Sequence, residues 1–352
     1  MKAKEKKLKQ GLSVVIITYN VERTFPKLLK TLSEQDYPKS KMEVLIIDGN
    51  STDKTLALAR KYKTKLPIKV VQSPYPRDPE ACRFVGLQAA KYDIFCYVDA
   101  DNYFHKKTWL SDGMKAMSAH KDVFGGYAWR YLYDKSDPVD FNRYFALVGF
   151  GDPVGYYLGK DDRMGYYTDK WIGLGKIVKD YGDYFLVAYD PKNFPTLGAN
   201  ASFFRKDLIM KHIKISAENV FHTDTALDMA RKGYNKYALF RVGIGHNATD
   251  SMWKFIKRRG RYMGLHYLSR FDSRRYRVFD PSRKEDLVHL AKFIICSLTF
   301  IEPLLLSIRG YIKIRDRAWF IHPIFCFCMC VMYMYSVSKG MVVIKLKNMV
   351  KG

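Results

Sequence analysis

Residues 97–102 read Tyr-Val-Asp-Ala-Asp-Asn, an apolar strand pattern that ends in two carboxylates one residue apart. Side chains alternate along a strand, so Asp99 and Asp101 can point the same way from its C-terminal end. Neighbouring carboxylates can hold a divalent cation, and ligands of open α/β sheets bind at the carboxyl ends of strands. Because Asp-x-Asp is also common in solvated turns, the surrounding sequence has to decide between the two interpretations.

The residues upstream alternate strand and helix patterns. Apolar, β-branched runs predict four strands, at residues 12–18, 44–47, 68–71 and 94–98. Helical spacing and capping residues predict three helices between them: residues 25–32, a helix that begins near Asp53 behind a Ser51 or Thr52 cap, and residues 79–90 behind an Asp78 cap. Short crossovers between strands predict a doubly wound, mainly parallel α/β sheet. Three carboxylates, those of Asp48, Asp99 and Asp101, would then gather at one edge.

Three segments, in this order, resemble the family 2 glycosyltransferases of the GT-A fold. They are VIITYN at residues 15–20, IDGNSTD at residues 47–53 and DAD at residues 99–101. The resemblance extends over roughly residues 12–265 and implies a Rossmann-like GT-A domain. It also implies a nucleotide-sugar donor and a divalent cation, Mn²⁺ or Mg²⁺, as cofactor.

The resemblance implies a role for each matching residue. Those that would bind the donor are Thr18, Tyr19, Asn20, Asp48, Arg83 and Asp99. The metal would be held by Asp101, with Asp99 and His246, and the acceptor side would be lined by Gly198, Ala199 and Asn200. The catalytic base would be Asp224. Two positions depart from the family pattern, since Phe84 replaces a common Asn and Thr223 replaces a common Glu.

The chemistry of sugar transfer explains these residue types. The leaving diphosphate needs positive charge, which a cation and guanidinium groups supply; Arg258 and Arg261 are candidates, with Tyr262 beside them on the acceptor side. A sugar hydroxyl is a poor nucleophile, so a carboxylate on the opposite face must take its proton, and direct displacement inverts the anomeric centre. Each role has a structural alternative: Asp224 as a helix cap, and His246 as a hydrogen-bonded residue at a strand end.

Residues 127–194 contain 18 aromatic residues, about a quarter of the segment, against 15% in the whole chain. Rings interleaved with Gly and Asp suit an irregular acceptor-binding loop, where they can lie against sugar faces. An additional subdomain with a small core of its own would show the same composition. The sequence leaves both interpretations open.

The C-terminal region is more basic than the rest. Residues 251–352 contain 20 Lys and Arg against six Asp and Glu, a net charge of +14 out of +25. Two apolar stretches, 287–308 and 318–337, approach the length that spans a bilayer. Because basic residues lie both between and outside them, a monotopic hairpin in the cytoplasmic leaflet fits the positive-inside rule better than two full spans. Buried core helices are the other alternative.

Together these features predict three regions: a basic tail at residues 1–11, a GT-A domain at 12–250 and a membrane-associating helical region at 251–352. The GT-A domain would comprise a nucleotide-sugar half, 12–126, and an acceptor half, 127–250. The Lys-rich first residues lead into a strand and not into a signal-peptide core, which favours the cytoplasmic face of the membrane.

The partners expected are a nucleotide sugar, a lipid-linked or glycan acceptor, and an anionic membrane surface. The basic residues near 270–284, namely Arg270, Arg274, Arg275, Arg277, Arg283 and Lys284, would attract that surface. No nucleic-acid partner is expected, because no helix-turn-helix, zinc or RNA-binding signature accompanies the charge. Two alternatives to a glycan transferase stay open: a polyprenyl-phosphate sugar synthase, and a catalytically silent GT-A scaffold that binds a glycan.

Overall fold

The computed structural model describes residues 10–161, 163–219, 221–247, 249–264, 270 and 273–351. The chain forms two compact units: residues up to Leu132 with Leu174–Asn247, and Tyr133–Gly173 with the residues from Ala248 onward. This division lies close to the predicted boundary at 250, but it groups residues 133–173 with the C-terminal region. Most of the predicted basic tail, residues 1–9, lies outside the described residues.

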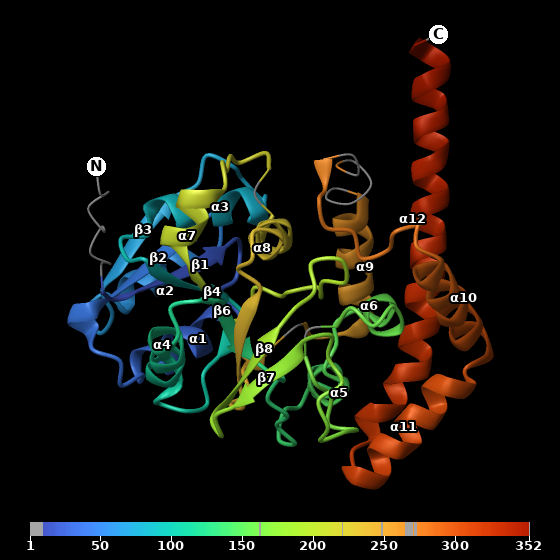
Figure 1. Ribbon diagram of the computed structural model, residues 1–352, viewed down its shortest axis with the longest axis horizontal. Helices are drawn as coiled ribbons and strands as arrows, with labels where there is room; N and C mark the ends of the chain where they lie inside the picture. The colour runs from blue at the N-terminus through green and yellow to red at the C-terminus, as the bar shows by residue number, and fades with distance from the viewer. Residues whose placement is uncertain are drawn as a thin grey trace. The chain divides into compact units, whose positions relative to one another are not determined.

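The first unit is built on a nine-stranded sheet in the order β3-β2-β1-β4-β9-β6-β10-β8-β7 (Figure 1). Its strands are β1 (Leu12–Thr18), β2 (Met42–Asp48), β3 (Ile68–Gln72), β4 (Ile94–Asp99), β6 (Val123–Ala128), β7 (Lys176–Asp180), β8 (Tyr184–Ala188), β9 (Ser202–Arg205) and β10 (Lys236–Phe240). The first four strands pair in parallel, which confirms the predicted doubly wound half. Because β9 runs antiparallel to both β4 and β6, the whole sheet is mixed.

Helices flank this sheet. They are α1 (Phe25–Ser33), α2 (Thr55–Lys61), α3 (Pro79–Ala89), α4 (Trp109–Ala119), α7 (Lys206–His212) and α8 (His222–Arg231), with a short 3-10 helix η1 (Lys39–Lys41). In α1, the apolar residues at spacings of three and four are fully buried, as predicted. Three further helices pack on strands of the sheet: α3 on β1 and β2, α4 on β6 and β10, and α7 on β4. The strands whose ends form the site are therefore packed against helices.

The predicted cap of α2 is wrong. The helix begins at Thr55, its N-cap position is Lys54, and that position has no side-chain cap hydrogen bond. Ser51 instead donates its hydroxyl to Asp48 Oδ1 at 2.6 Å, and Asp53 Oδ1 accepts from the Thr55 N–H at 2.9 Å. A hydrogen bond to a buried carboxylate is stronger than one to an uncharged group at a helix terminus. The Ser51 hydroxyl therefore bonds to Asp48 at the end of β2 and does not cap α2. The prediction for α3 is confirmed, since Asp78 accepts from the Glu80 and Ala81 N–H groups.

The second unit is helical. Its elements are α5 (Asp140–Val148), α6 (Pro153–Tyr157), α9 (Met252–Tyr262), α10 (Lys284–Thr299), α11 (Ile301–Lys313), the 3-10 helix η4 (Arg317–Phe320) and α12 (Ile321–Lys351). Within the unit, α5 packs on η4 and α12, and α6 packs on α10. The aromatic-rich segment therefore splits: residues 133–173 share a core with the C-terminal helices, and residues 174–194 contribute β7 and β8 to the sheet.

The sequence predicts one hydrophobic helix over residues 287–308. The structure contradicts this prediction, because the stretch is divided between two helices. It belongs to α10 and α11, which are bent by 77° at a break between them. Phe300, the residue at the break, has a left-handed backbone with φ 61°. Pro303 explains the position, because in a continuous helix its ring would clash with the carbonyl of Thr299 and it has no N–H to donate.

Among the described residues, one helix, Arg317–Gly340, is long and apolar enough to cross a membrane, and α10 with α11 passes the same test only as a bent pair. A core helix of a soluble protein can have the same properties. A third of the hydrophobic window of Arg317–Gly340 is buried inside the protein.

Candidate active site

Asp48 ends β2 at the carboxyl edge of the sheet and is almost completely buried. Its Oδ1 accepts from the Thr18 hydroxyl at 3.0 Å, and its Oδ2 accepts from the Ser51 N–H at 2.9 Å. Thr18 ends the neighbouring strand β1, so parallel register brings the two side chains together. The structure therefore joins two of the predicted donor-binding residues in one buried cluster.

Tyr19 and Asn20 follow β1 and lie beside this cluster. Asn20 has φ 50°, and its side-chain oxygen accepts from the Thr52 N–H at 2.8 Å. The guanidinium of Arg77 lies 5.2 Å from the centre of the Tyr19 ring. An aromatic face, an amide and a guanidinium thus lie next to the buried carboxylate of Asp48, and such groups can recognise a base and a ribose.

Asp99, at the end of β4, belongs to a chain of charged side chains. Arg83 on α3 donates to Asp99 Oδ1 at 3.0 Å and to Glu80 Oε1 at 2.8 Å. Glu80, which is fully buried, also contacts His222 Nδ1 at 3.1 Å. The structure thus pairs two of the predicted donor-binding residues, Arg83 and Asp99, and extends the pair by Glu80 and His222, which were not predicted.

The charge state of Glu80 follows from its neighbours. Burial by itself raises the pKa of this carboxyl group. The attraction of His222 and Arg83 outweighs burial, and the pKa of Glu80 lies well below its ordinary 4.5. Glu80 is therefore a buried anion that ties the first turn of α8 to the site edge.

Asp101 lies near His246, one of the other predicted metal ligands. The Asp101 Oδ2 atom is 3.5 Å from His246 Nε2. Two short strands, β5 (Asn102–Tyr103) and β11 (Gly245–His246), pair antiparallel and hold the two residues together. A carboxylate oxygen beside an imidazole nitrogen is a donor set that suits Mn²⁺. Across the described part of the chain, however, no three His, Cys, Asp or Glu side chains are grouped so as to hold a metal ion.

A polar network connects this pair to the predicted acceptor segment. Asn102 donates to Asn200 Oδ1 at 3.0 Å, and Asn200 in turn donates to the Tyr131 hydroxyl at 3.1 Å. The Tyr131 ring is stacked on the His246 ring, with 5.1 Å between their centres. The residues before Asn200 belong to the same loop, in which the Gly198 carbonyl accepts from Ser202 and the Ala199 side chain is buried.

Asp224 lies in the first turn of α8 and is fully buried. It does not occupy the N-cap position, which is Phe221. A general base has to reach the acceptor hydroxyl, so its role as base stays a prediction. The other predicted residues, Arg258, Arg261 and Tyr262, lie on α9 in the second unit, and their roles also stay predictions.

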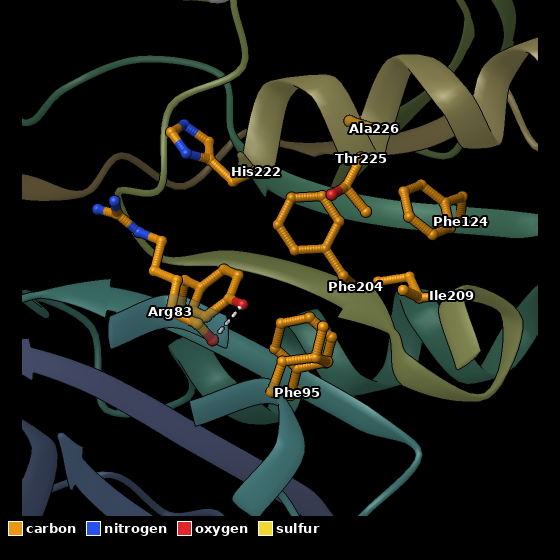
Figure 2. A pocket seen from close by; sticks show the side chains of 10 residues that line it. Arg83, Phe95, Phe124, Phe204, Ile209, His222, Thr225 and Ala226 are labelled. Atoms are coloured by element: carbon orange, nitrogen blue, oxygen red, sulfur yellow. Dashed lines mark hydrogen bonds between the residues drawn. The ribbon is translucent and has the colours of Figure 1, made fainter. Parts of the chain in front are cut away.

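A small cavity of about 20 Å³ lies behind Arg83 and His222 (Figure 2). Figure 2 shows these two side chains at one end of the cavity and the rings of Phe95, Phe204 and Phe124 further in. The Tyr97 hydroxyl donates to the Arg83 carbonyl at 3.0 Å and fixes the base of that side chain. The volume holds about one water molecule, so this cavity is a packing defect behind the site and not a substrate pocket.

Sequence reasoning missed four residues of this site: Arg77, Glu80, Tyr131 and His222. For Glu80 a signal existed, since an acidic residue three positions before Arg83 on a predicted helix can form an ion pair. The contact between Glu80 and His222 joins residues 142 positions apart, and no local pattern reports it. Tyr131 lay within the aromatic-rich segment, where one ring could not be distinguished from the others.

Part of this chain matches a known protein family. Residues 13–163 match glycosyl transferase family 2. The poly(ribitol-phosphate) beta-N-acetylglucosaminyltransferase TarS of Staphylococcus aureus is 38% identical over 109 residues, which are 31% of this chain and 19% of TarS. A Methanococcus voltae enzyme is 44% identical over 95 residues, 26% of this chain and 29% of its own length. Its name is dolichyl N-acetyl-alpha-D-glucosaminyl phosphate 3-beta-D-2,3-diacetamido-2,3-dideoxy-beta-D-glucuronosyltransferase.

These matches cover less than a third of each relative's length. Among solved structures, the mannosyltransferase PcManGT from Pyrobaculum calidifontis, in complex with GDP-Man and Mn²⁺, superposes with a TM-score of 0.53 at 16% identity. The alignment covers 94% of this chain and 86% of PcManGT, and at this identity it shows the fold alone. The chain is therefore built on the GT-A fold and carries a glycosyl transferase family 2 domain.

Proposed function

We propose that this protein transfers a sugar from a nucleoside-diphosphate sugar to a lipid-linked glycan, with a divalent cation and with inversion at the anomeric carbon. One observation carries the proposal: at the carboxyl edge of β1, β2 and β4, buried Asp48, the Arg83–Asp99 pair and the Asp101–His246 pair lie at adjacent strand ends. Ligands of open α/β sheets bind at this edge. The relatives named above act on sugar or polyol phosphate substrates, by their names.

The donor is proposed to lie across the ends of β1 and β2. The base and the ribose would lie among Thr18, Tyr19, Asn20 and Asp48. The Asp48 carboxylate would accept a hydrogen bond from a ribose hydroxyl. Arg83 holds the Asp99 carboxylate in place, so that it presents acceptor oxygens in one orientation. These side chains would fix the donor before any bond changes.

The cation site is proposed at Asp101 and His246, with Asp99 nearby. When bound there, the ion would neutralise charge on the leaving diphosphate. The two protein donors leave coordination positions for phosphate oxygens, as is usual for cations that bind with a nucleotide. Arg258 and Arg261 are proposed to contact the same diphosphate, because guanidinium groups match phosphate oxygens.

Asp224 is proposed as the general base. It would take the proton of the acceptor hydroxyl while the acceptor oxygen bonds to the anomeric carbon and the bond from that carbon to the diphosphate breaks. Gly198, Ala199, Asn200 and Tyr262 are proposed to line the acceptor side. Asn200 is tied to Asn102, so an acceptor held there would lie next to the carboxylate motif.

The protein is proposed to act at the cytoplasmic face of a membrane through a monotopic hairpin. The 77° bend between α10 and α11 and the single apolar helix that follows support a helical anchor. Basic residues between them, from Arg309 to Arg317, suit the anionic cytoplasmic leaflet. Protease protection in sealed vesicles tests this placement, since a shielded 309–317 segment would contradict it.

The first experiment measures nucleotide release by the purified chain, over a panel of nucleotide sugars, with Mn²⁺, with Mg²⁺ and with EDTA. Cation-dependent release should fall about 10³-fold in Asp101→Ala. The control is Asp112→Ala, which should retain release, because Asp112 lies on α4 and pairs with Lys106 away from the ends of β1, β2 and β4. Donor binding is measured in parallel. Absence of both release and cation-dependent binding would favour a silent scaffold.

A second candidate is a polyprenyl-phosphate sugar synthase, and the complete burial of Asp224 favours it. Its nucleophile is a phosphate oxygen that is already anionic and needs no base. Asp224→Asn separates the two candidates, with donor binding as the control for folding. Loss of transfer with intact donor binding supports the base, while full transfer to a lipid phosphate supports the synthase.

A further inference from the structure

The second unit contains a cavity of about 570 Å³ among α6, α9, α10 and α12. Most of its wall is apolar and includes Phe293 and Ile294 on α10 and Val337 on α12. A methylene group occupies about as much space as a water molecule, roughly 30 Å³. The cavity therefore holds about 19 methylene groups. It has the size of a small-molecule site, and it accommodates a single lipid chain.

The polar part of the wall is strongly basic. It contains three guanidinium groups, those of Arg259, Arg274 and Arg277, and one carboxylate, that of Asp152. Asp152 Oδ2 accepts from Arg259 Nε at 3.0 Å. Guanidinium groups thus outnumber carboxylates in the cavity wall by three to one, beside an apolar interior, and this arrangement suits an anionic amphiphile.

The position of Arg274 strengthens this interpretation. The sequence placed it in a basic surface for membrane lipids, but its side chain is buried, with 6% exposed. Interactions within the protein hold this guanidinium in the cavity wall. In the cavity wall, Arg274 can serve a bound ligand more directly than it can serve a flat membrane surface.

We propose that this cavity binds a single-chain lipid phosphate, with the chain between α10 and α12 and the phosphate against Arg274 and Arg277. The ligand class follows from volume, apolar lining and charge. Its identification as the lipid carrier of the acceptor rests on the proposed function. Binding itself does not, since it needs no sugar donor.

The test uses the 352-residue chain in phosphatidylcholine nanodiscs without nucleotide sugar, and equilibrium binding of farnesyl phosphate. Farnesol supplies the chain without the phosphate, and inorganic phosphate supplies the charge without the chain. Ile294→Trp fills the cavity, and Leu298→Trp, one turn further along α10 and 51% exposed, is its matched control. Arg277→Gln removes one charge, with exposed Arg60→Gln on α2 of the first unit as control.

Farnesyl phosphate should bind at least about tenfold more tightly than farnesol or inorganic phosphate. Ile294→Trp should abolish binding and Arg277→Gln should weaken it about tenfold, with both controls unchanged. Equal binding by the two Trp variants, equal affinity for farnesol, or displacement by added phosphatidylglycerol would overturn the proposal. Binding as expected, together with neither nucleotide release nor cation-dependent donor binding, would leave the cavity assigned and the proposed function refuted.

Discussion

The two units hold their charged side chains in different ways. In the first unit, carboxylates lie at the ends of parallel strands, and Asp48 is held by Thr18 at the end of β1 and by Ser51 in the segment after β2. In the second unit, charged side chains join helices that are distant in the sequence. Examples are Arg143 Nε with Asp316 Oδ2 at 2.8 Å, and Tyr157 with Glu302.

This difference shows what positions a polar group in each unit. At the sheet edge the backbone register does it, so a side chain can be changed while its neighbours keep their places. Among the helices, side-chain pairs surrounded by apolar residues determine how the helices pack. Substitutions should therefore have local effects in the first unit and wider effects in the second, except where the first unit also uses a long-range pair.

Glu80 is that exception, and its loss should have the largest effect. Glu80→Ala leaves Arg83 without one buried carboxylate and separates His222 from α3. We expect the free energy of unfolding of the first unit to fall by about 3–5 kcal/mol, as for other broken buried ion pairs. Denaturant unfolding followed by hydrogen exchange in α3 and α8 measures this. Unchanged exchange in both helices would contradict the prediction.

The same pair predicts a pH dependence. Because the folded-state pKa of Glu80 is depressed, its contribution to stability is fully present above its ordinary 4.5 and is lost as the pH falls through the folded-state value. Between pH 5 and pH 3 (about the range in which unfolded carboxyls titrate), the wild type should therefore lose stability more steeply with falling pH than Glu80→Gln does, as urea unfolding at each pH measures. Glu80→Gln should lack this contribution at neutral pH, and the difference between the two proteins should shrink in acid.

Asp48→Asn should have the next largest effect. The carboxylate accepts from Thr18, from the Ser51 N–H and from the Ser51 hydroxyl, and an amide offers only one acceptor oxygen in its place. We expect a loss of about 2–3 kcal/mol, typical of hydrogen bonds to a charged group, confined to the ends of β1 and β2. Asp112→Asn on α4, where a half-buried carboxylate also accepts from a hydroxyl, that of Thr108, is the matched control. Loss of protection throughout the sheet would argue against local positioning.

Arg143→Ala tests the second unit. Its guanidinium contacts Asp316 and Asp140 and thereby joins α5 to the residue before η4. The local free energy of unfolding should fall by about 2 kcal/mol, and protection from exchange should fall in both α5 and η4. An effect limited to α5 would mean that the helices pack without this ion pair.

Lys313→Ala should have the smallest effect. Lys313 pairs with Asp169 in the same unit, but both side chains are exposed. Exposed pairs contribute little, so we expect a change below about 0.5 kcal/mol in the thermal or denaturant midpoint. A loss as large as that of Arg143→Ala would show that burial does not distinguish the two pairs.

The fold of the first unit and much of its edge could be predicted because each local signal agreed with the others. Strand patterns ended in polar residues, and parallel pairing necessarily brought Asp48, Asp99 and Thr18 to one edge. The proximity of Asp101 and His246 followed only from the family resemblance. No strand pattern indicates the two-residue pairing that holds them.

The rest depended on competition between local and distant contacts. Ser51 could cap a helix or bond a carboxylate, and only the buried position of Asp48 decided between them. Pro303 was visible in an apolar stretch, but a bilayer-length pattern concealed the helix break that it causes at Phe300. The grouping of residues 133–173 with the C-terminal helices required ion pairs and ring contacts that join distant parts of the chain.

The way the second unit is assembled has a consequence for synthesis on the ribosome. Helix α5 emerges long before η4 and α12, which bury its Tyr144 and Phe141 rings. During that interval the apolar face of α5 is not covered by the later helices of its unit, and a chaperone can bind to it. For the same reason, a shortened chain that stops near residue 250 would keep α5 and lose what covers it. Expression trials should therefore remove residues 133–173 together with the C-terminal helices, or neither.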